Sequence, residues 1–289
     1  MKPAAFEYLV PTSLSEALQL LADHHEAARP LAGGQSLVPL MNFRLARPAY
    51  LVDLNGLREL DYLKVENGEL RIGAMTRQRA LERSSNVTAG WPLLHEATRY
   101  IGHMQIRNRG TVGGSLAHAY PAAELPLAMV ALDARFVLRN HTSERIVAAK
   151  DFFLDAMSTV LEPAELLIEA RVPKTAPRTG SDFQEVSRRH GDFALAAVAG
   201  TVTLRSDGTI DKANLVFSGS KPQLWNNAEM LIGMKPGRSL FAEVANAAAG
   251  QLETESDIHA SADYRKEVSK VLARRVLEQA ATRASAGAK

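Results

Sequence analysis

Two glycine pairs, 80 residues apart, constrain the fold of this chain more than any other feature of its sequence. One lies in Ala32-Gly33-Gly34-Gln35-Ser36 and the other in Thr111-Val112-Gly113-Gly114-Ser115. Consecutive glycines let the main chain take positive φ and remove the Cβ atoms that would keep a ligand away, so successive N–H groups can converge on an anion. Ser36, Thr111 and Ser115 can add hydroxyl donors. We therefore expect two turns that can bind phosphate.

The pairing of the two motifs matters more than either motif alone. A single Gly-Gly pair is usually no more than a tight turn. One such turn can satisfy one phosphate, whereas two facing turns can bracket a diphosphate, which favours a dinucleotide as ligand. Neither motif matches G-x-G-x-x-G or G-x-x-x-x-G-K-[ST], so neither a Rossmann fold nor a mononucleotide phosphate loop is expected.

The composition is that of a globular protein without metal or disulfide cross-links. The chain has 289 residues, of which 46% are hydrophobic, and can form two or three compact units. Its 34 basic and 32 acidic residues nearly cancel, so nothing indicates nucleic acid or a charged membrane as partner. The absence of cysteine excludes disulfides, thiolate nucleophiles and cysteine-bound iron–sulfur clusters. With no signal peptide and no run of about 20 apolar residues, the protein is predicted to be cytoplasmic.

The apolar pattern predicts both helices and strands. A helix is expected to start at Ser13, which can cap it while Glu16 bonds back to the cap amide. Other helices are predicted at residues 76–83, 92–102 and 262–284, the last with Val268, Val271, Leu272 and Val276 on one face. Strands are predicted near residues 29–32, 51–54, 69–74, 134–138, 167–172, 195–204 and 213–218. The turn-rich residues 174–181 are the best candidate for a domain boundary.

The sequence around the glycine pairs resembles that of the medium, flavin-carrying subunits of the xanthine dehydrogenase and carbon monoxide dehydrogenase family. The resemblance covers nearly the whole chain, in the segments 31–48, 105–118, 121–126, 165–173, 187–194 and 264–275. It implies an α+β fold, with a two-lobed PCMH-type FAD-binding domain at residues 1–176 and a C-terminal domain of antiparallel sheet and helices at residues 177–289. The two lobes are expected at about residues 1–56 and 57–176.

The resemblance also implies which residues bind FAD. It assigns the pyrophosphate to the two glycine motifs, namely Ala32, Gly33, Gly34, Gln35, Ser36 and Leu37 with Thr111, Val112, Gly113, Gly114 and Ser115. Glu124 stands where the family usually has Asp and is expected to bind a polar part of the cofactor. Phe193 is expected near the isoalloxazine ring, Leu167 or Ile168 at the ring edge, and Asp192, next to Phe193, is also expected to bind the cofactor. Ile168 and its neighbour Leu167 read equally well as buried strand residues, and Phe193 as the start of a core strand.

Two side chains depart from the family pattern. Glu124 keeps the charge of the usual Asp on a longer arm, and Tyr120 replaces an Asp that commonly precedes the proline. The remaining candidates are weaker. The histidines show no recurrent ligand spacing, so no metal site is expected on this chain. No G-x-S-x-G elbow and no obvious acid/base pair of carboxylates occurs, so no catalytic residue is expected either. Arg107, Arg109, Arg188 and Arg189 either steer an anionic cofactor or partner or are ordinary solvated charges.

The function implied by the resemblance is electron transfer through FAD. In this family a large subunit oxidises the substrate at a molybdopterin centre, and a small subunit relays electrons through two [2Fe–2S] clusters to FAD, which passes them to an external acceptor. The expected assembly is a dimer of heterotrimers. The sequence leaves the substrate and the acceptor open. It also leaves two alternatives, a stand-alone flavin oxidase and a non-catalytic assembly subunit whose flavin site has decayed, with Tyr120 and Glu124 as signs of that decay.

Overall fold

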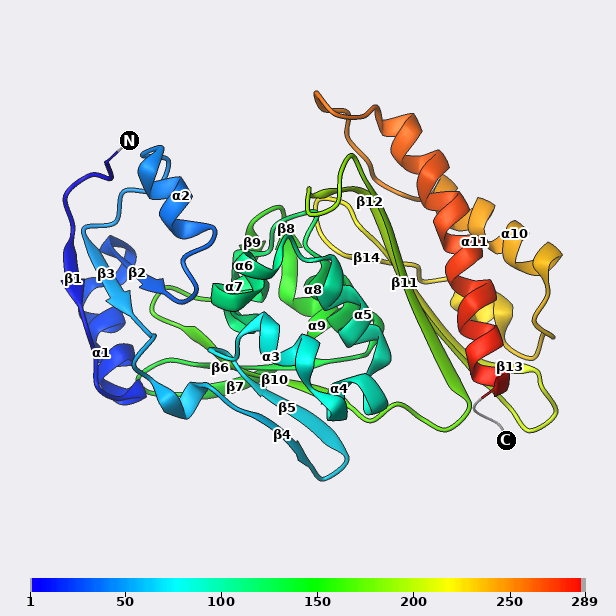
Figure 1. The fold of residues 1–289 in the computed structure, drawn as a ribbon, viewed down its shortest axis with the longest axis horizontal. Helices are drawn as coiled ribbons and strands as arrows, with labels where there is room; N and C mark the ends of the chain where they lie inside the picture. The colour runs from blue at the N-terminus through cyan, green and yellow to red at the C-terminus, as the bar shows by residue number, and fades with distance from the viewer. Residues whose placement is uncertain (1, 287–289) are drawn as a thin grey trace.

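The computed structural model describes residues 2–286, which form three units side by side (Figure 1). A small N-terminal lobe lies at one end, a larger second lobe lies in the middle, and a sheet covered by two long helices lies at the other end. The expected α+β class is confirmed. No helix in the described part of the chain is long and apolar enough to cross a membrane.

The N-terminal lobe is a parallel sheet covered by a helix. Its strands β1 (Glu7–Leu9), β2 (Ala28–Leu31) and β3 (Tyr50–Asp53) lie in the order β1-β3-β2, and its helices are α1 (Leu14–His24) and α2 (Leu37–Asn42). One face of α1 is apolar and buried, with the residues Leu14, Ala17, Leu18, Leu21 and Ala22. Ser13 caps the helix by accepting a hydrogen bond from the amide of Glu16, as predicted. The second predicted bond, from the Ser13 amide to the Glu16 carboxylate, is shifted by one residue. The carboxylate accepts instead from the amide of Thr12.

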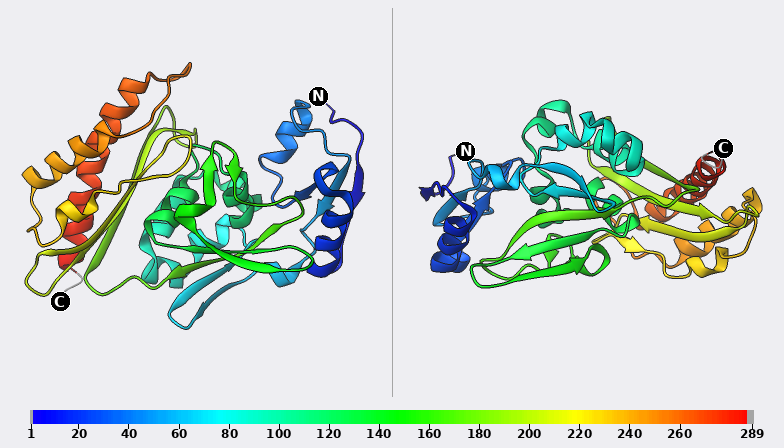
Figure 2. Two further views of the ribbon diagram at one scale, coloured as in Figure 1. Left: turned by 180° about the vertical axis from the view of Figure 1, so that it is seen from behind. Right: turned by 90° about the horizontal axis from the view of Figure 1, so that it is seen from below.

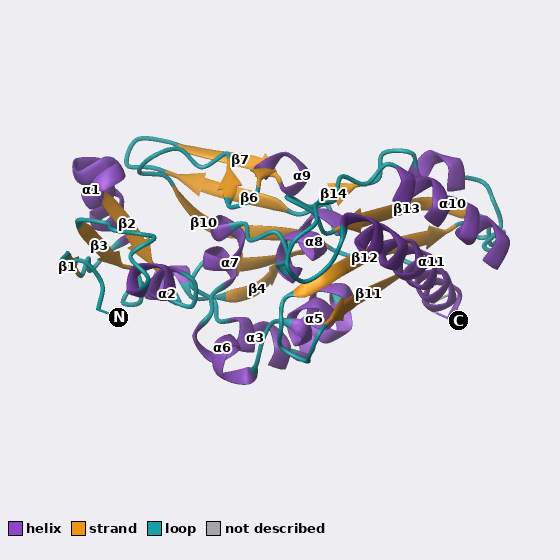
Figure 3. Ribbon diagram, turned by 90° about the horizontal axis from the view of Figure 1, so that it is seen from above, coloured by secondary structure: helices purple, strands orange, loops and turns teal. Residues whose placement is uncertain are grey.

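The second lobe is an antiparallel sheet with helices on one face. The strands are β4 (Leu63–Glu66), β5 (Glu69–Gly73), β6 (Arg135–Arg139), β7 (Glu144–Ala148) and β10 (Leu166–Pro173), in the order β4-β5-β10-β6-β7. The helices are α3 (Gln78–Arg83), α4 (Ser85–Gly90), α5 (Pro92–Tyr100), α6 (Met104–Arg109), α7 (Val112–His118) and α8 (Glu124–Ala131), with the short α9 (Ala149–Phe152) and the hairpin β8 (Phe153–Asp155) and β9 (Ser158–Thr159) beside them. Figure 3 shows α3, α5 and α6 in one layer and the sheet behind them.

The C-terminal unit is an antiparallel sheet buried on both faces. Strands β11 (Thr179–Ser187), β12 (Ala194–Leu204), β13 (Ile210–Phe217) and β14 (Gln223–Leu224) follow one another in space as in sequence. Helices α10 (Arg238–Gly250) and α11 (Ala262–Ala286) cover one face, as Figure 2 shows from behind. Apolar side chains of the other face, among them Phe183 and Ala199, join the core of the second lobe.

Two details of the C-terminal unit differ from the prediction. The turn-rich segment 174–181 runs directly into β11, a long strand that the sequence analysis missed. Its residues have low strand propensity, and its pairing along the whole length of β12 stabilises it instead. Val271 is 40% exposed, whereas Leu272 and Val276 are buried, because the helix turns its small residues Ala273, Ala280 and Ala284 toward the sheet.

Candidate functional site

The first glycine motif forms the turn between β2 and α2. Gly34 has a φ of 73°, a conformation that side chains with a Cβ rarely adopt. Within residues 2–286, the backbone N–H groups of Gly33, Gly34, Gln35 and Ser36 have no acceptor. A cavity of about 350 Å³ opens beside them, lined by Leu31 to Gln35, Val38, Pro39, Asn55 and Arg109. The prediction of a turn with open amide donors is therefore correct for this motif.

The second glycine motif is the first turn of α7 and not an open turn. Thr111 caps the helix, and its Oγ1 accepts from the amide of Gly114 at 3.1 Å. The amide of Val112 donates to Thr76 O at 3.0 Å, and that of Gly113 donates to Ala74 O at 2.8 Å. The expectation that this motif also presents a run of free amides is wrong, because helix capping and a bridge to the segment before α3 take up its donors.

The two motifs touch where the two lobes meet. A Cβ on Gly33 would collide with the carbonyl oxygen of Arg109 and would lie 2.8 Å from Cα of Gly110. A Cβ on Gly114 would lie 3.5 Å from the Cβ of Ala32. The glycine at position 113 is needed for another reason, since its Cβ would strike Ala74. In the second motif, Gly113 therefore lets α7 pack on Ala74 within the second lobe, Gly114 leaves room for the Thr111 cap and lies beside Ala32 of the N-terminal lobe, and the supply of donors is left to the first motif.

Arg109 and Asn55 line this cavity, and Asn55 is not among the residues that the sequence predicted to bind the cofactor. Arg109 is exposed and lies two residues before the second motif, so its closeness to this motif is already visible in the sequence. Asn55 follows β3 in a different segment, and only the parallel pairing of β2 with β3 brings it beside the first motif. Its Nδ2 donates to the carbonyl of Ala32 at 3.0 Å.

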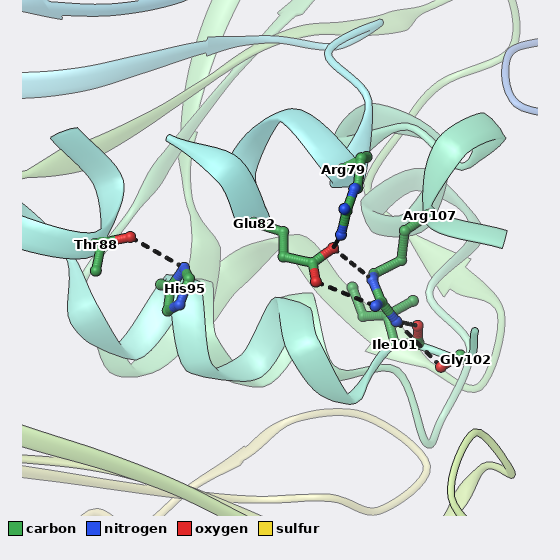
Figure 4. A network of polar contacts seen from close by, with 7 residues as sticks. All are labelled: Arg79, Glu82, Thr88, His95, Ile101, Gly102 and Arg107. Carbon is green, nitrogen blue, oxygen red and sulfur yellow. Dashed lines mark hydrogen bonds and ion pairs between the residues drawn. The ribbon is translucent and has the colours of Figure 1, made fainter. Parts of the chain in front are cut away.

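Arg107 does not face the cavity, so it cannot steer a cofactor (Figure 4). Its guanidinium is buried and pairs with Glu82 through Nε at 2.9 Å. It also donates to the carbonyls of Ile101 at 2.8 Å and Gly102 at 3.2 Å. Arg79 binds the same carboxylate at 2.7 Å. This network fixes α6, and hence the start of α7, on α3.

Glu124 is the first residue of α8 and is only 6% exposed. No other described residue donates a hydrogen bond to its side chain. Burial raises the pKa of Glu124 to about 7, against a smaller lowering effect of its own backbone amide and the Arg107 charge. Glu185 on β11 behaves similarly, because burial and the charge of Glu124 raise its pKa to about 8. At neutral pH, Glu124 is therefore about half protonated and Glu185 is mostly protonated.

Glu185 lies at the wall of a second cavity. This space of about 510 Å³ lies between α5, β11 and α11, and its wall also includes Tyr100, His190 and Arg275. The Oε2 atom of Glu185 is buried without a hydrogen-bond partner among the described residues. An uncharged carboxyl is the form that tolerates such a position.

The residues predicted near the flavin ring divide into two groups. Phe193 is 61% exposed just before β12, so its reading as the start of a core strand is wrong. Its ring contacts Tyr120 with centroids 4.3 Å apart, which links the β11–β12 turn to the loop before α8. Asp192 lies in the same turn and pairs with Arg188 at 3.6 Å. Phe193, Asp192 and Tyr120 therefore form one surface cluster.

Ile168 belongs to the other group and is buried. It is 9% exposed and packs in the core that the N-terminal lobe shares with β10, whereas Leu167 points into the core of the second lobe. The reading of both as buried strand residues is confirmed. The carbonyl of Ile168 accepts from the amide of Ala74 at 2.9 Å, so this strand supports the residue on which Gly113 packs.

Comparison with known proteins decides the family. Residues 4–175 match the model for the FAD binding domain in molybdopterin dehydrogenase, and residues 181–280 match the model for the CO dehydrogenase flavoprotein C-terminal domain. This chain belongs to the FAD-binding subunits of the molybdenum hydroxylases. The predicted family, the α+β fold class, FAD as the cofactor and the electron-transfer role are confirmed for the chain.

Several relatives match this flavin subunit over nearly the whole length of both chains. The 6-hydroxypseudooxynicotine dehydrogenase complex subunit alpha of Paenarthrobacter nicotinovorans is 40% identical over 98% of this chain and 97% of its own. Caffeine dehydrogenase subunit beta of a Pseudomonas species is 38% identical with the same coverage. The solved carbon monoxide dehydrogenase of Hydrogenophaga pseudoflava gives a TM-score of 0.95 at 36% identity, over 98% of this chain and 99% of that one.

The residues present in this flavin subunit fit FAD. A diphosphate needs several donors and an approach free of side chains, and the open amides of Gly33 to Ser36 at the edge of a cavity supply both. Arg109, which lines the same cavity, adds a positive charge. A buried Glu124 without a donor from another residue is a suitable partner for a polar group of the cofactor.

Proposed function

We propose that the FAD diphosphate lies against the first glycine motif, Ala32 to Leu37, at the line where this motif meets Thr111 to Ser115. The run of amides without acceptors between Gly33 and Ser36 carries this assignment. In this arrangement the first motif donates the hydrogen bonds. The second motif provides a glycine surface, to which the hydroxyl of Ser115 adds a polar contact, while the buried Thr111 supports the motif as the cap of α7.

We place the flavin end of the cofactor toward Glu124 and the cluster of Asp192, Phe193 and Tyr120. A protonated Glu124 can donate a hydrogen bond, which an ionised carboxylate cannot do. Phe193 can shield the ring, and its contact with Tyr120 holds it in place. Ile168 acts indirectly. It is part of the core, and its carbonyl binds the amide of Ala74, on which Gly113 of the second motif packs. When bound, FAD supplies the redox chemistry, and the protein positions it.

We propose that the partners are a large molybdopterin subunit and a small subunit with two [2Fe–2S] clusters, in a cytoplasmic dimer of heterotrimers. Names such as complex subunit alpha and medium chain support a multi-subunit assembly. The names of relatives at similar identity refer to 6-hydroxypseudooxynicotine, caffeine and carbon monoxide, so they select no single substrate. The proposed domain boundary remains at residues 176 and 177, just before β11.

A visible absorption spectrum of the chain, purified with the subunits that accompany it, tests this function. We expect stoichiometric FAD that is reduced when the substrate of the large subunit is added. Failure of the chain to hold or take up FAD would instead support a decayed flavin site. Turnover of an organic donor by the chain without partners would support a stand-alone flavin oxidase.

A further inference from the structure

Two polar side chains outside the glycine motifs join the two lobes beside the cavity. Arg77, which precedes α3 in the second lobe, donates from Nη2 to Asn55 Oδ1 at 2.7 Å. Asn55, which follows β3 in the N-terminal lobe, donates from Nδ2 to the carbonyl of Ala32 at 3.0 Å. Arg77 also donates from Nη1 to the carbonyl of Arg109. We call this pair the Asn55–Arg77 clasp.

The clasp closes a ring of contacts around the meeting point of the two motifs. Ala32 is the first residue of the first motif, and its neighbour Gly33 packs against the same Arg109 carbonyl that accepts from Arg77. The path from Gly33 through Arg109, Arg77 and Asn55 therefore returns to Ala32. A closed ring that includes backbone atoms of both lobes fixes their separation, whereas a single contact would allow them to slide.

Further groups hold the clasp in one geometry. The carboxylate of Asp53 accepts from the backbone amide of Asn55 at 3.0 Å and from its side chain, and it also accepts from the hydroxyl of Tyr8. Burial would raise the pKa of Asp53, but these hydrogen bonds and the Arg77 charge lower it overall, so the carboxylate stays ionised. With its amide nitrogen bound to two acceptors, Asn55 presents its oxygen to Arg77.

We propose that Arg77 and Asn55 are positioning residues for FAD, which set the separation between the open amides of the first motif and the start of α7. This inference rests on the proposed placement of the diphosphate. The clasp acts through main-chain atoms, so the donors have their binding geometry before the cofactor arrives. A lysine at position 77 cannot replace the arginine, because an ammonium lacks the planar fork that spans two acceptors.

The test compares Arg77→Gln and Asn55→Ala with a matched control, Arg83→Gln. Arg83 carries the same charge at the end of α3, is exposed, and has no ion pair or side-chain hydrogen bond among the described residues, so it takes no part in the ring. The full-length chain is freed of FAD and titrated with FAD, and binding is followed by flavin fluorescence. We expect each clasp variant to bind FAD about tenfold more weakly and the control to bind like wild type. The double variant should bind FAD only slightly more weakly than either single variant, because each single change already breaks the same ring of contacts.

Two further measurements separate positioning from loss of folding. Guanidinium ion at low concentration should restore FAD affinity to Arg77→Ala but should have no such effect on Asn55→Ala, and the thermal midpoint of the apoproteins should change little. FAD affinity within twofold of wild type in both clasp variants would overturn the inference. The inference would also be overturned if FAD affinity fell only in proportion to the thermal midpoint and guanidinium ion did not restore it. If Gly33→Ala loses FAD while the clasp variants retain it, the positioning role of the clasp is wrong but the proposed placement of the diphosphate stands. If all three variants retain FAD, the proposed placement of the diphosphate is wrong.

Discussion

Gly33→Ala adds one methyl group at the point where the two motifs touch. The expected effect is entirely steric, because Gly33 does not have a positive φ and alanine can adopt its backbone conformation. The new Cβ would collide with the Arg109 carbonyl and lie 2.8 Å from the Gly110 Cα, whereas ordinary contacts begin at 3.4 Å. Relieving the contact with the Gly110 Cα alone requires a separation of about 0.6 Å, from 2.8 to 3.4 Å, and the closer collision with the Arg109 carbonyl oxygen requires a larger shift.

The affinity loss follows from the cost of this overpacking. Forcing one extra methyl into a packed site costs about 1–3 kcal/mol. The obstructing atoms are backbone atoms, one of which is held by Arg77, so they cannot rotate away as a side chain would. If the whole cost falls on the conformation that binds FAD, the dissociation constant rises by about 5- to 150-fold, at about 1.4 kcal/mol per factor of ten.

The assay is a titration of the apoprotein with FAD, with far-UV circular dichroism on the same samples. Gly90→Ala is the matched control, because Gly90 ends α4 and a Cβ there would meet nothing within 4 Å. We expect normal secondary structure in both variants and weak FAD binding only in Gly33→Ala. Unchanged affinity in Gly33→Ala would refute the argument, since it would show that the contact yields freely or that the diphosphate lies elsewhere.

Three other changes test other parts of the structure by chemical denaturation. Arg107→Gln should lower the free energy of unfolding by about 1–3 kcal/mol, because the carbonyls of Ile101 and Gly102 lose a buried donor while Glu82 keeps Arg79 as its partner, whereas breaking the surface pair with Lys270→Gln should cost less than about 1 kcal/mol. Glu185 has a raised pKa of about 8, so the native apoprotein binds more protons than the unfolded chain and loses stability as the pH rises from about 4.5 to 8. Glu185→Gln should remove the part of this loss that is due to Glu185 and leave the part due to Glu124, so its stability should fall less with pH than that of wild type. A pH profile of the variant parallel to that of wild type would contradict the raised pKa. Gly180→Ala should destabilise the C-terminal unit by about 1–3 kcal/mol, because its Cβ would strike the backbone of α11, and should leave FAD affinity unchanged.

The sequence by itself determined the local features of this protein. The cap at Ser13, the apolar face of α1 and the long last helix follow from propensity and period, which act over a few residues. The first glycine motif was also predictable, because the need for positive φ at Gly34 and the open amides are properties of one short turn. The resemblance to a known family, present in the ordered motifs, identified the cofactor.

The tertiary structure alone decided what depends on partners distant in the sequence. Arg107 and Arg109 look alike in the sequence, yet one is buried against Glu82 and the other lines the cavity. The amides of the second motif are occupied by Thr76, Ala74 and the cap, which no local pattern indicates. The Asn55–Arg77 clasp joins residues 22 positions apart through the packing of two lobes. Hydrogen bonds and burial between such segments depend on the whole fold. For that reason the sequence predicted the motif that we propose binds FAD, but not the contacts that hold this motif in place.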